Sequence, residues 1–427
     1  MTTASPGRTR PIRTQRAARL VVACLVAALL AACTNTMGGS NSVESTQSGG
    51  TLTTAKTVNA NALAAVIKKT FLTDIPVSEM NPVVADTMAV ASQPLTPQQK
   101  QLFHSCLQRN SCDTGHGSLT VAIALESSNA WDSIFRAEAT EQALAYPQVK
   151  RIIYNNANGD ISAVLANLRS LIVQQVDIIV TDPVFGGDIL SAVQLAKQAG
   201  ITVVTVNTPV PPSVGSLVAA QIPLTLCQIY TEGATELINA LGRNGTYALY
   251  TGIPGNSNAA AWQPCLKKTL DAAGWTESTV GYTQWTAQGA AQAADALLAS
   301  GKHPDAIIYD YTTEDFLKPY VTAHRTPPAF LSDVMNYVWL SGVQQAKQAG
   351  IPVQSWLASG HVWFGRFGVT AGVEIREGLH VDKEIPVPIP VVPAHSVLDT
   401  NSPSIPSDVP VSSLLTPQQM TWALAAP

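Results

Sequence analysis

Apolar and polar positions alternate in blocks along the middle of the chain, and these blocks predict strands followed by helices. Residues 119–125 form an apolar run broken only by Thr120, which is too short for a membrane span and typical of a buried parallel strand. The run ends in the polar residues 126–129. Apolar residues then follow at helical spacing: Trp131, Ile134, Phe135 and Ala139. A strand that passes through a polar turn into a helix opens an α/β unit, and such units hold ligands at the carboxyl end of the strand.

The same alternation continues towards the carboxyl terminus. Further strands are predicted at residues 151–154, 177–181, 201–206, 217–222, 246–250, 280–283, 305–309, 329–331 and 352–357. Helices are predicted at residues 161–173, 189–198, 226–241, 259–273, 287–298, 339–348 and 367–377. Two successive sets of similar size predict two lobes of one α/β architecture, although the sequence contains no strict repeat.

The amino terminus has the pattern of an export signal. A basic start is followed by an apolar run at residues 20–30 and then by Leu30-Ala31-Ala32-Cys33. That tetrapeptide resembles the lipobox of bacterial lipoproteins, which predicts a signal peptide at residues 1–32 and a lipid anchor on Cys33. The protein is then expected at the extracytoplasmic face of the cell membrane. The alternative is an ordinary cleaved signal with an incidental cysteine.

The flanks of the α/β region have different compositions. Residues 33–58 are rich in Ser, Thr, Gly and Asn and predict a flexible tether. Residues 59–116 predict an extension packed on the main body, with a helix at 59–71 and a helix start at Thr96-Pro97. Residues 397–427 form a carboxyl-terminal tail, in which Thr416-Pro417 opens a short helix.

Composition narrows the classes of ligand. Charged residues make up 13% of the chain and the net charge is −4, so no basic surface is available for nucleic acid. The sequence has no phosphate-binding P-loop and no G-x-G-x-x-G, G-x-S-x-G or H-E-x-x-H motif, so we expect no cofactor.

Four cysteines follow Cys33, and an even number in an oxidising compartment predicts disulfides. Three pairings are possible. We favour Cys106 with Cys112 and Cys227 with Cys265, because each pair then lies within one local region. Metal binding is the rival interpretation, but the sequence has no Cys-x-x-Cys or His-x-x-x-His spacing, so we expect no metal site.

Five stretches within residues 117–395 resemble type I periplasmic binding proteins, of the ribose-binding or sugar ABC-transporter branch. They are TVAIALESSNAWDSIF, VDIIVTDPVFGGDILSAVQLAKQAGITVVTVNTP, ALYTGIPGNSNAAAWQPCLKKTLDAAG, HPDAIIYDY and FGVTAGVEIREG. The resemblance implies two doubly wound parallel-sheet lobes joined by a hinge, which close over a ligand. Lobe 1 is expected at residues 117–220 plus 363–381, and lobe 2 at residues 221–362 plus 382–396.

The family's ligand-contact positions fall on eleven residues of this chain. They are Asn129, Trp131, Asp132, Asn207, Thr208, Trp262, Trp285, Asp310, Tyr311, Asp333 and Trp363. The most serious departure is at Asn207-Thr208, where the family has an Asp-Arg pair that grips sugar hydroxyls. An aromatic residue of the family is replaced by Asp132, and an Arg by Trp262. The four tryptophans imply a broader, more apolar site, suited to a larger, flatter or less hydroxylated ligand than ribose.

Each of these residues also has a purely structural interpretation. A buried Trp is often part of the core. Asn129 is placed to cap the helix that follows it, and Asp132 is a first-turn carboxylate favoured by the helix dipole. Asn207 closes a turn in the simplest interpretation.

The resemblance implies a monomeric substrate-binding protein of an ABC importer that captures a sugar-like solute and delivers it to a membrane permease. It makes and breaks no bond, so it is not an enzyme. One alternative is a sensory module that presents its ligand to a membrane receptor. Another is an enzyme that uses the cleft between the lobes, but Asp310 and Asp333 alone do not form a recognisable catalytic set.

Overall fold

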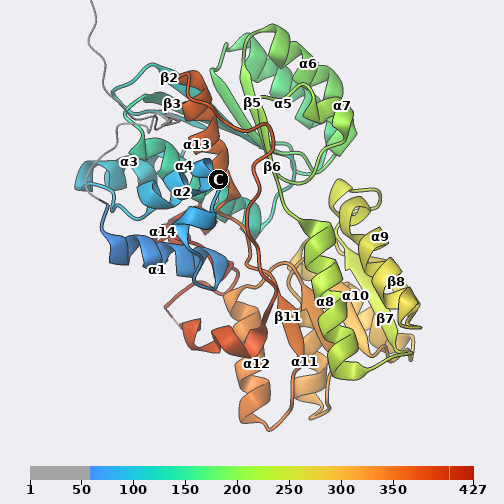
Figure 1. Cartoon of the computed structure of the whole chain (residues 1–427). Coiled ribbons are helices and arrows are strands. Elements are labelled where there is room, and N and C mark those ends of the chain that lie inside the picture. The colour runs from blue at the N-terminus through green and yellow to red at the C-terminus, as the bar shows by residue number, and fades with distance from the viewer. Residues whose placement is uncertain (1–57, 403) are drawn as a thin grey trace, which may run out of the picture. The chain divides into compact units, whose positions relative to one another are not determined.

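The computed structural model describes residues 58–402 and 404–427. The predicted signal peptide at residues 1–32, the anchor Cys33 and nearly all of the predicted tether at 33–58 lie outside the described residues. The described chain is built on two six-stranded sheets, each flanked by helices (Figure 1).

The first sheet has the strand order β1-β3-β2-β4-β5-β6. Its strands are β1 (Ser111–Asp113), β2 (Leu119–Leu125), β3 (Val149–Asn156), β4 (Ile178–Asp182), β5 (Thr202–Asn207) and β6 (Ala220–Pro223). All neighbours are parallel except β1, which pairs antiparallel with β3 at the edge. This sheet with its helices is called lobe 1 below, and it extends to Pro223, past the expected boundary at residue 220.

Helices cover both faces of the first sheet. They are α4 (Ala130–Ala145), α5 (Ile161–Val173), η2 (Gly186–Ile189), α6 (Leu190–Gln198), α7 (Pro212–Gly215) and α13 (Phe364–Arg376). Ile179 belongs to the core formed with α5 and α6, whereas its neighbour Val180 belongs to the core on the other face. A Cβ on Gly368 of α13 would lie 2.5 Å from Cγ1 of Val180, so glycine allows this helix to approach the sheet closely.

The second sheet has the strand order β12-β11-β10-β9-β7-β8. Its strands are β7 (Thr246–Thr251), β8 (Thr276–Tyr282), β9 (Ala306–Tyr309), β10 (Ala329–Ser332), β11 (Ser355–Leu357) and β12 (Val392–Pro393). Only the β11–β12 pair is antiparallel. This sheet with its helices is called lobe 2 below.

The helices of lobe 2 are α8 (Leu226–Leu241), α9 (Ser257–Ala272), α10 (Ala287–Ala299), α11 (Glu314–Thr322) and α12 (Tyr337–Gln348). Successive residues of β10 point to opposite faces of the sheet. Leu331 meets Gly233 of α8, while Phe330 packs edge-on against Trp339 of α12 with ring centroids 5.0 Å apart. The second sheet is therefore also covered on both faces.

The two lobes share one topology. When the antiparallel edge strands are set aside, the parallel strands run in the order second, first, third, fourth, fifth in each sheet. The predicted architecture of two doubly wound lobes is therefore confirmed. In both lobes the carboxyl ends of the central strands face a common region, where such sheets hold ligands.

The amino-terminal extension and α14 pack on lobe 1, whereas η3 packs on α12 and β11 of lobe 2. The amino-terminal extension contains α1 (Ala60–Phe71), η1 (Val77–Glu79), α2 (Pro82–Ala91) and α3 (Pro97–Leu107), and the carboxyl-terminal segment contains η3 (Ala394–Thr400) and α14 (Pro417–Leu424). Both Thr-Pro signals begin helices, since Thr96 and Thr416 each form a capping box with the Gln three residues later. Helices α2, α3 and α14 lie against α4 or α13 (Figure 1).

Residues 407–414, called the C-terminal crossing below, connect the two lobes. On lobe 2, the backbone N–H of Val411 donates to the carbonyl of Met335 at 2.9 Å, and the N–H of Tyr337 donates to the carbonyl of Val409 at 3.1 Å. On lobe 1, the N–H of Leu414 donates to Glu138 of α4 at 2.6 Å. The buried Arg366 of α13 forms an ion pair with the same Glu138.

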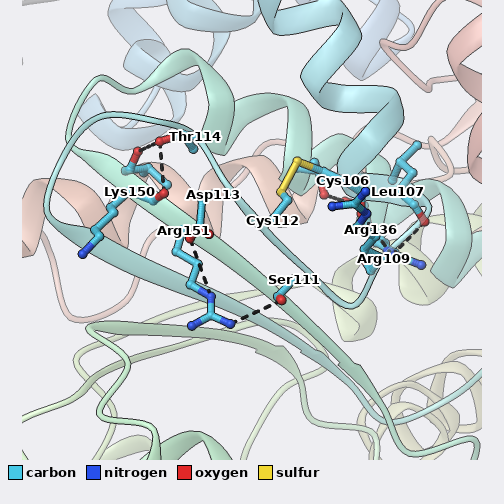
Figure 2. Close-up of a disulfide and its surroundings, with 12 residues drawn as sticks. Cys106, Leu107, Arg109, Ser111, Cys112, Asp113, Thr114, Arg136, Lys150 and Arg151 are labelled. Atoms are coloured by element: carbon cyan, nitrogen blue, oxygen red, sulfur yellow. Dashed lines mark hydrogen bonds and ion pairs between the residues drawn. A yellow bond between two sulfur atoms is a disulfide. The ribbon is translucent and has the colours of Figure 1, made fainter.

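Two disulfides reinforce the fold, and they are the pairs favoured from the sequence. Cys106–Cys112 joins the end of α3 to the edge strand β1, and Cys227–Cys265 joins α8 to α9. Figure 2 shows the first bond beside Arg136, whose guanidinium donates to the carbonyls of Leu107 at 2.9 Å and Arg109 at 2.8 Å. The edge strand is thus held by a covalent bond, and the chain leading into it is held by a buried cation.

Within the part of the chain that the structure describes, no helix combines the length and apolar character needed to span a membrane.

Removing Cys227–Cys265 by a double substitution to Ala is expected to cost more stability than removing Cys106–Cys112 in the same way. The bonded cysteines are separated by 38 and 6 residues. Loop-closure entropy in the unfolded chain gives roughly 4 and 2 kcal/mol for loops of these lengths. Denaturant unfolding of both double variants measures the difference, and a larger loss for the Cys106–Cys112 variant would contradict this account.

Candidate ligand-binding cleft

A buried cavity lies where the carboxyl ends of strands from the two lobes meet. Its walls combine acidic, amide, aromatic and aliphatic side chains from both sheets. The lining residues are Ser127, Asn129, Trp131, Asp182, Val184, Asn207, Leu224, Asn258, Trp285, Asp310, Tyr311, Asp333, Val334 and His361. Asp182 and Asn207 end strands β4 and β5, and Asp310 and Asp333 directly follow strands β9 and β10. The parallel topology therefore places these side chains together.

The carboxylate of Asp310 accepts three hydrogen bonds from its own lobe. The hydroxyl of Thr251 and the indole N–H of Trp262 donate to Oδ2 at 2.6 and 3.0 Å, and the indole N–H of Trp285 donates to Oδ1 at 2.9 Å. Burial raises the pKa of Asp310 to about 6, although these hydrogen bonds act in the opposite direction. The donors hold Asp310 in place and leave it little capacity to bind anything else.

Asp182 has a similar arrangement in lobe 1. The side-chain amide of Asn207 donates to its Oδ2 at 2.9 Å, and the backbone N–H of Thr208 donates to its Oδ1 at 3.1 Å. Burial raises the pKa of Asp182 to about 6. Because the Nδ2 of Asn207 is committed to Asp182, its Oδ1 points elsewhere, and it has no hydrogen-bond partner.

Asp333 and His361 face each other without forming a strong ion pair. The imidazole Nε2 lies 3.9 Å from Oδ2 of Asp333, and both side chains are buried. Burial raises the pKa of Asp333 well above its usual value, with a further contribution from the charge of Asp310, and burial lowers the pKa of His361 to about 3. Oδ1 of Asp333 and both imidazole nitrogens have no hydrogen-bond partner.

Three lining residues adopt a left-handed backbone conformation that is rare for residues other than glycine. Their φ angles are 61° for Asn207, 50° for Trp285 and 38° for His361. A bulky residue such as Trp pays for this conformation in strain, and such strain is concentrated at functional sites. The backbone here directs side chains into the cavity at the expense of local stability.

The two lobes touch around the cavity. The indole N–H of Trp131 donates to the carbonyl of Gly360 at 2.7 Å, and the N–H of Ser257 donates to the carbonyl of Val184 at 3.3 Å. A Cβ on Gly186 would lie 2.0 Å from Oγ of Ser257, so only glycine permits this approach. The cavity measures about 40 Å³, which is room for a few water molecules.

The structure brings seven of the eleven sequence-predicted contact residues into the cavity lining. They are Asn129, Trp131, Asn207, Trp285, Asp310, Tyr311 and Asp333. Asn129 lines the cavity and also caps α4, since its Oδ1 accepts from the N–H of Asp132 at 3.1 Å.

The other four do not line this cavity. Trp262 lies behind Asp310 and stacks on Tyr230, with ring centroids 4.2 Å apart. Thr208 contributes its backbone N–H to Asp182. Trp363 packs against Phe71 of the amino-terminal extension, with ring centroids 5.3 Å apart.

Asp132, the fourth, accepts hydrogen bonds from the hydroxyl of Ser127 at 3.0 and 3.1 Å. It borders a separate polar cavity of about 350 Å³, lined also by Arg136 and Tyr154 of lobe 1 and by Pro427 at the carboxyl terminus. Burial and the charge of Asp182 raise the pKa of Asp132 to about 7.

Sequence reasoning missed several lining residues, including Asp182, Asn258 and His361. The position of Asp182 could have been predicted, because it is the polar residue directly after the strand predicted at 177–181. The position of His361 could not have been predicted, because the sequence of the loop before α13 has no pattern that indicates burial of its residues.

Comparisons with known proteins agree with this fold. Residues 121–318 match the family model described as periplasmic binding protein domain. The search against curated proteins gives no match.

Three solved structures illustrate the fold. An ABC transporter solute-binding protein from Bacillus halodurans with bound myo-inositol has a TM-score of 0.58 at 16% identity, covering 67% of this chain and 98% of that chain. Another from Agrobacterium vitis with bound D-fucose has a TM-score of 0.57 at 16% identity, covering 65% and 96%. The fructose-binding periplasmic domain of a hybrid two-component system has a TM-score of 0.56 at 17% identity, covering 66% and 93%. The chain therefore has the type I periplasmic-binding-protein fold, which confirms the resemblance seen in the sequence.

The buried carboxyls predict how stability depends on pH. In the unfolded chain their pKa is about 4. The folded chain holds these protons more tightly, so its free energy of unfolding is expected to fall as pH rises from about 4 towards 8. For Asp132, whose folded pKa is about 7, the contribution is present below pH 4 and is lost by about pH 7.

The melting temperature without ligand should therefore be higher at about pH 5.5 than at about pH 8. Asp132→Asn should reduce this difference, whereas Asp295→Asn, at an exposed position of α10, should not. Equal pH dependence in the two variants would contradict the assignment to Asp132.

Proposed function

We propose that the protein is a lipid-anchored substrate-binding protein of an ABC importer, which captures a sugar-like solute between its lobes. The observation that carries this proposal is the set of unpartnered polar atoms around the cavity: Oδ1 of Asn207, Asn258 and Asp333, and both imidazole nitrogens of His361. A buried polar atom without a partner costs about 1–3 kcal/mol. A solute with several hydroxyls both donates and accepts, so it satisfies such atoms on binding.

The remaining walls suit the same kind of ligand. Trp131, Trp285 and Tyr311 provide flat apolar surfaces next to the polar groups, as pockets for small polar ligands commonly do. The solved structures with this fold include proteins with bound myo-inositol and D-fucose. Capture by hinge closure accounts for the direct contacts between the lobes at Trp131 and Gly186.

A sensory function is the second candidate, and one specific comparison favours it. A solved structure of the same fold is the fructose-binding periplasmic domain of a hybrid two-component system. The lobes of a sensor and of a transport protein have the same geometry, so the partner distinguishes them: a membrane permease for transport, or a membrane receptor for sensing.

Catalysis in the cleft has less support. The matching family model describes a binding-protein domain, and these solved structures are of binding proteins. Asp310, one of the two carboxylates considered for an enzyme, is occupied by three donors from its own lobe.

Trp131→Ala is expected to weaken binding of a sugar-like solute at least tenfold, equivalent to about 1.4 kcal/mol, because it removes an aromatic wall and the contact with Gly360. Isothermal titration with a ligand identified from a panel including myo-inositol and D-fucose measures the change. Trp422→Ala is the matched control. Trp422 of α14 packs against His104 of α3 and does not line the cavity. Equal affinity of the Trp131 variant and the wild type would assign that ring to packing alone.

Cys33→Ala is expected to release the protein from the membrane, because the acylated thiol is the proposed anchor. Fractionation of cells that express the wild type or the variant, followed by immunoblotting, measures the distribution. Retention of the variant in the membrane fraction would refute acylation at Cys33 without affecting the cleft.

A further inference from the structure

The charge of the cavity wall is one-sided. Three carboxyl groups line it, those of Asp182, Asp310 and Asp333, and no Lys or Arg is present among the lining residues. A fourth carboxyl, Asp132, is close enough to Asp182 for each charge to oppose the other. An anionic solute would therefore meet repulsion and find no counter-charge.

No Lys or Arg lines the cavity to balance these groups, and burial raises the pKa of all three lining carboxyls, so a bound cation would favour their ionised form. His361 is the nearest candidate cation, at 3.9 Å from Asp333, but burial lowers its pKa to about 3 and it is neutral at pH 7. The described residues also contain no group of three His, Cys, Asp or Glu side chains that could hold a metal ion. A positively charged solute would supply the charge that the lining lacks.

The unpartnered oxygens add a second, independent requirement. The amide of Asn207 donates to Asp182, so its free Oδ1 is an acceptor, and Asp333 Oδ1 is likewise unpartnered. Both residues are only 4% exposed. The solute must bring hydrogen-bond donors to them, and an ammonium group brings three with a positive charge.

The aromatic walls are compatible with a cation. Trp131 and Tyr311 line the same cavity as Asp333, and a cation over an aromatic ring gains electrostatic attraction that is strongest when both are removed from water.

We propose that the solute is a cationic, hydroxyl-bearing molecule of the amino-sugar or aminocyclitol class, whose ammonium group pairs with Asp333. This inference rests on the proposed function and narrows its ligand. The hydroxyls of the solute bind the remaining amide and imidazole groups, and its ammonium supplies the charge that the lining lacks.

The test compares matched charged and neutral ligands on the wild-type full chain by isothermal titration at pH 7. The pairs are D-glucosamine with D-glucose, D-galactosamine with D-galactose, D-mannosamine with D-mannose, and scyllo-inosamine with scyllo-inositol. At least one amine is expected to bind tenfold or more tightly than its neutral partner. N-acetyl-D-glucosamine, which keeps the nitrogen but loses the charge, is expected to bind no better than D-glucose.

Asp333→Asn serves as the second measurement, because it keeps the size of the side chain and removes its charge. It is expected to weaken binding of the amine more than binding of the neutral partner. If neutral sugars bind as tightly as the amines or more tightly, the charge inference is overturned and the proposed sugar-like ligand stands. If no member of the panel binds, the proposed function is overturned together with the inference.

Discussion

The buried carboxylate of Asp310 ties together the wall of lobe 2, and the geometry of the cleft depends on it. It accepts hydrogen bonds from the end of β7, from α9 and from the loop before α10, through Thr251, Trp262 and Trp285. Two indole N–H groups would otherwise be buried without acceptors, and a lone buried carboxylate would be costly without donors. The carboxylate and its donors therefore make one another's burial possible. Their hydrogen bonds also hold Trp285 in its strained backbone conformation.

Polar side chains around the cavity fall into two groups: those hydrogen-bonded within their own lobe and those with free atoms that could contact a ligand. Asp310 and Asp182 are bonded to neighbours in their own lobes, so they position other side chains. Asn207, Asp333 and His361 retain free polar atoms that face the cavity. Native proteins leave few buried polar groups without partners, so a cluster of them at one place is a strong indication of a ligand.

Much of this arrangement was predictable from the sequence, because it follows from local patterns. The ends of apolar runs place Asn129, Asn207, Asp310 and Asp333 at the carboxyl edge of parallel strands, and the structure shows them there. Short-range patterns do not report contacts between distant segments. The packing of Trp363 on Phe71 depends on an extension that lies almost three hundred residues earlier in the sequence.

Local patterns also failed for some elements. Helix α11 contains Pro319, which interrupts the usual helical pattern, and β1 is a strand of only three residues held at the edge of its sheet by pairing with β3. Neither was predicted. Helix α2 was also missed, since its apolar residues are spread around the helix instead of forming one stripe.

The C-terminal crossing has a kinetic consequence for the hinge. It is bonded to Met335 and Tyr337 on one side and to Glu138 on the other, in addition to the three chain connections that follow β6, β11 and α13. Any opening that increases the separation of Met335 and Glu138 must break some of these bonds or unravel the crossing. Under the proposed capture of a solute between the lobes, this segment would slow release without lining the cavity.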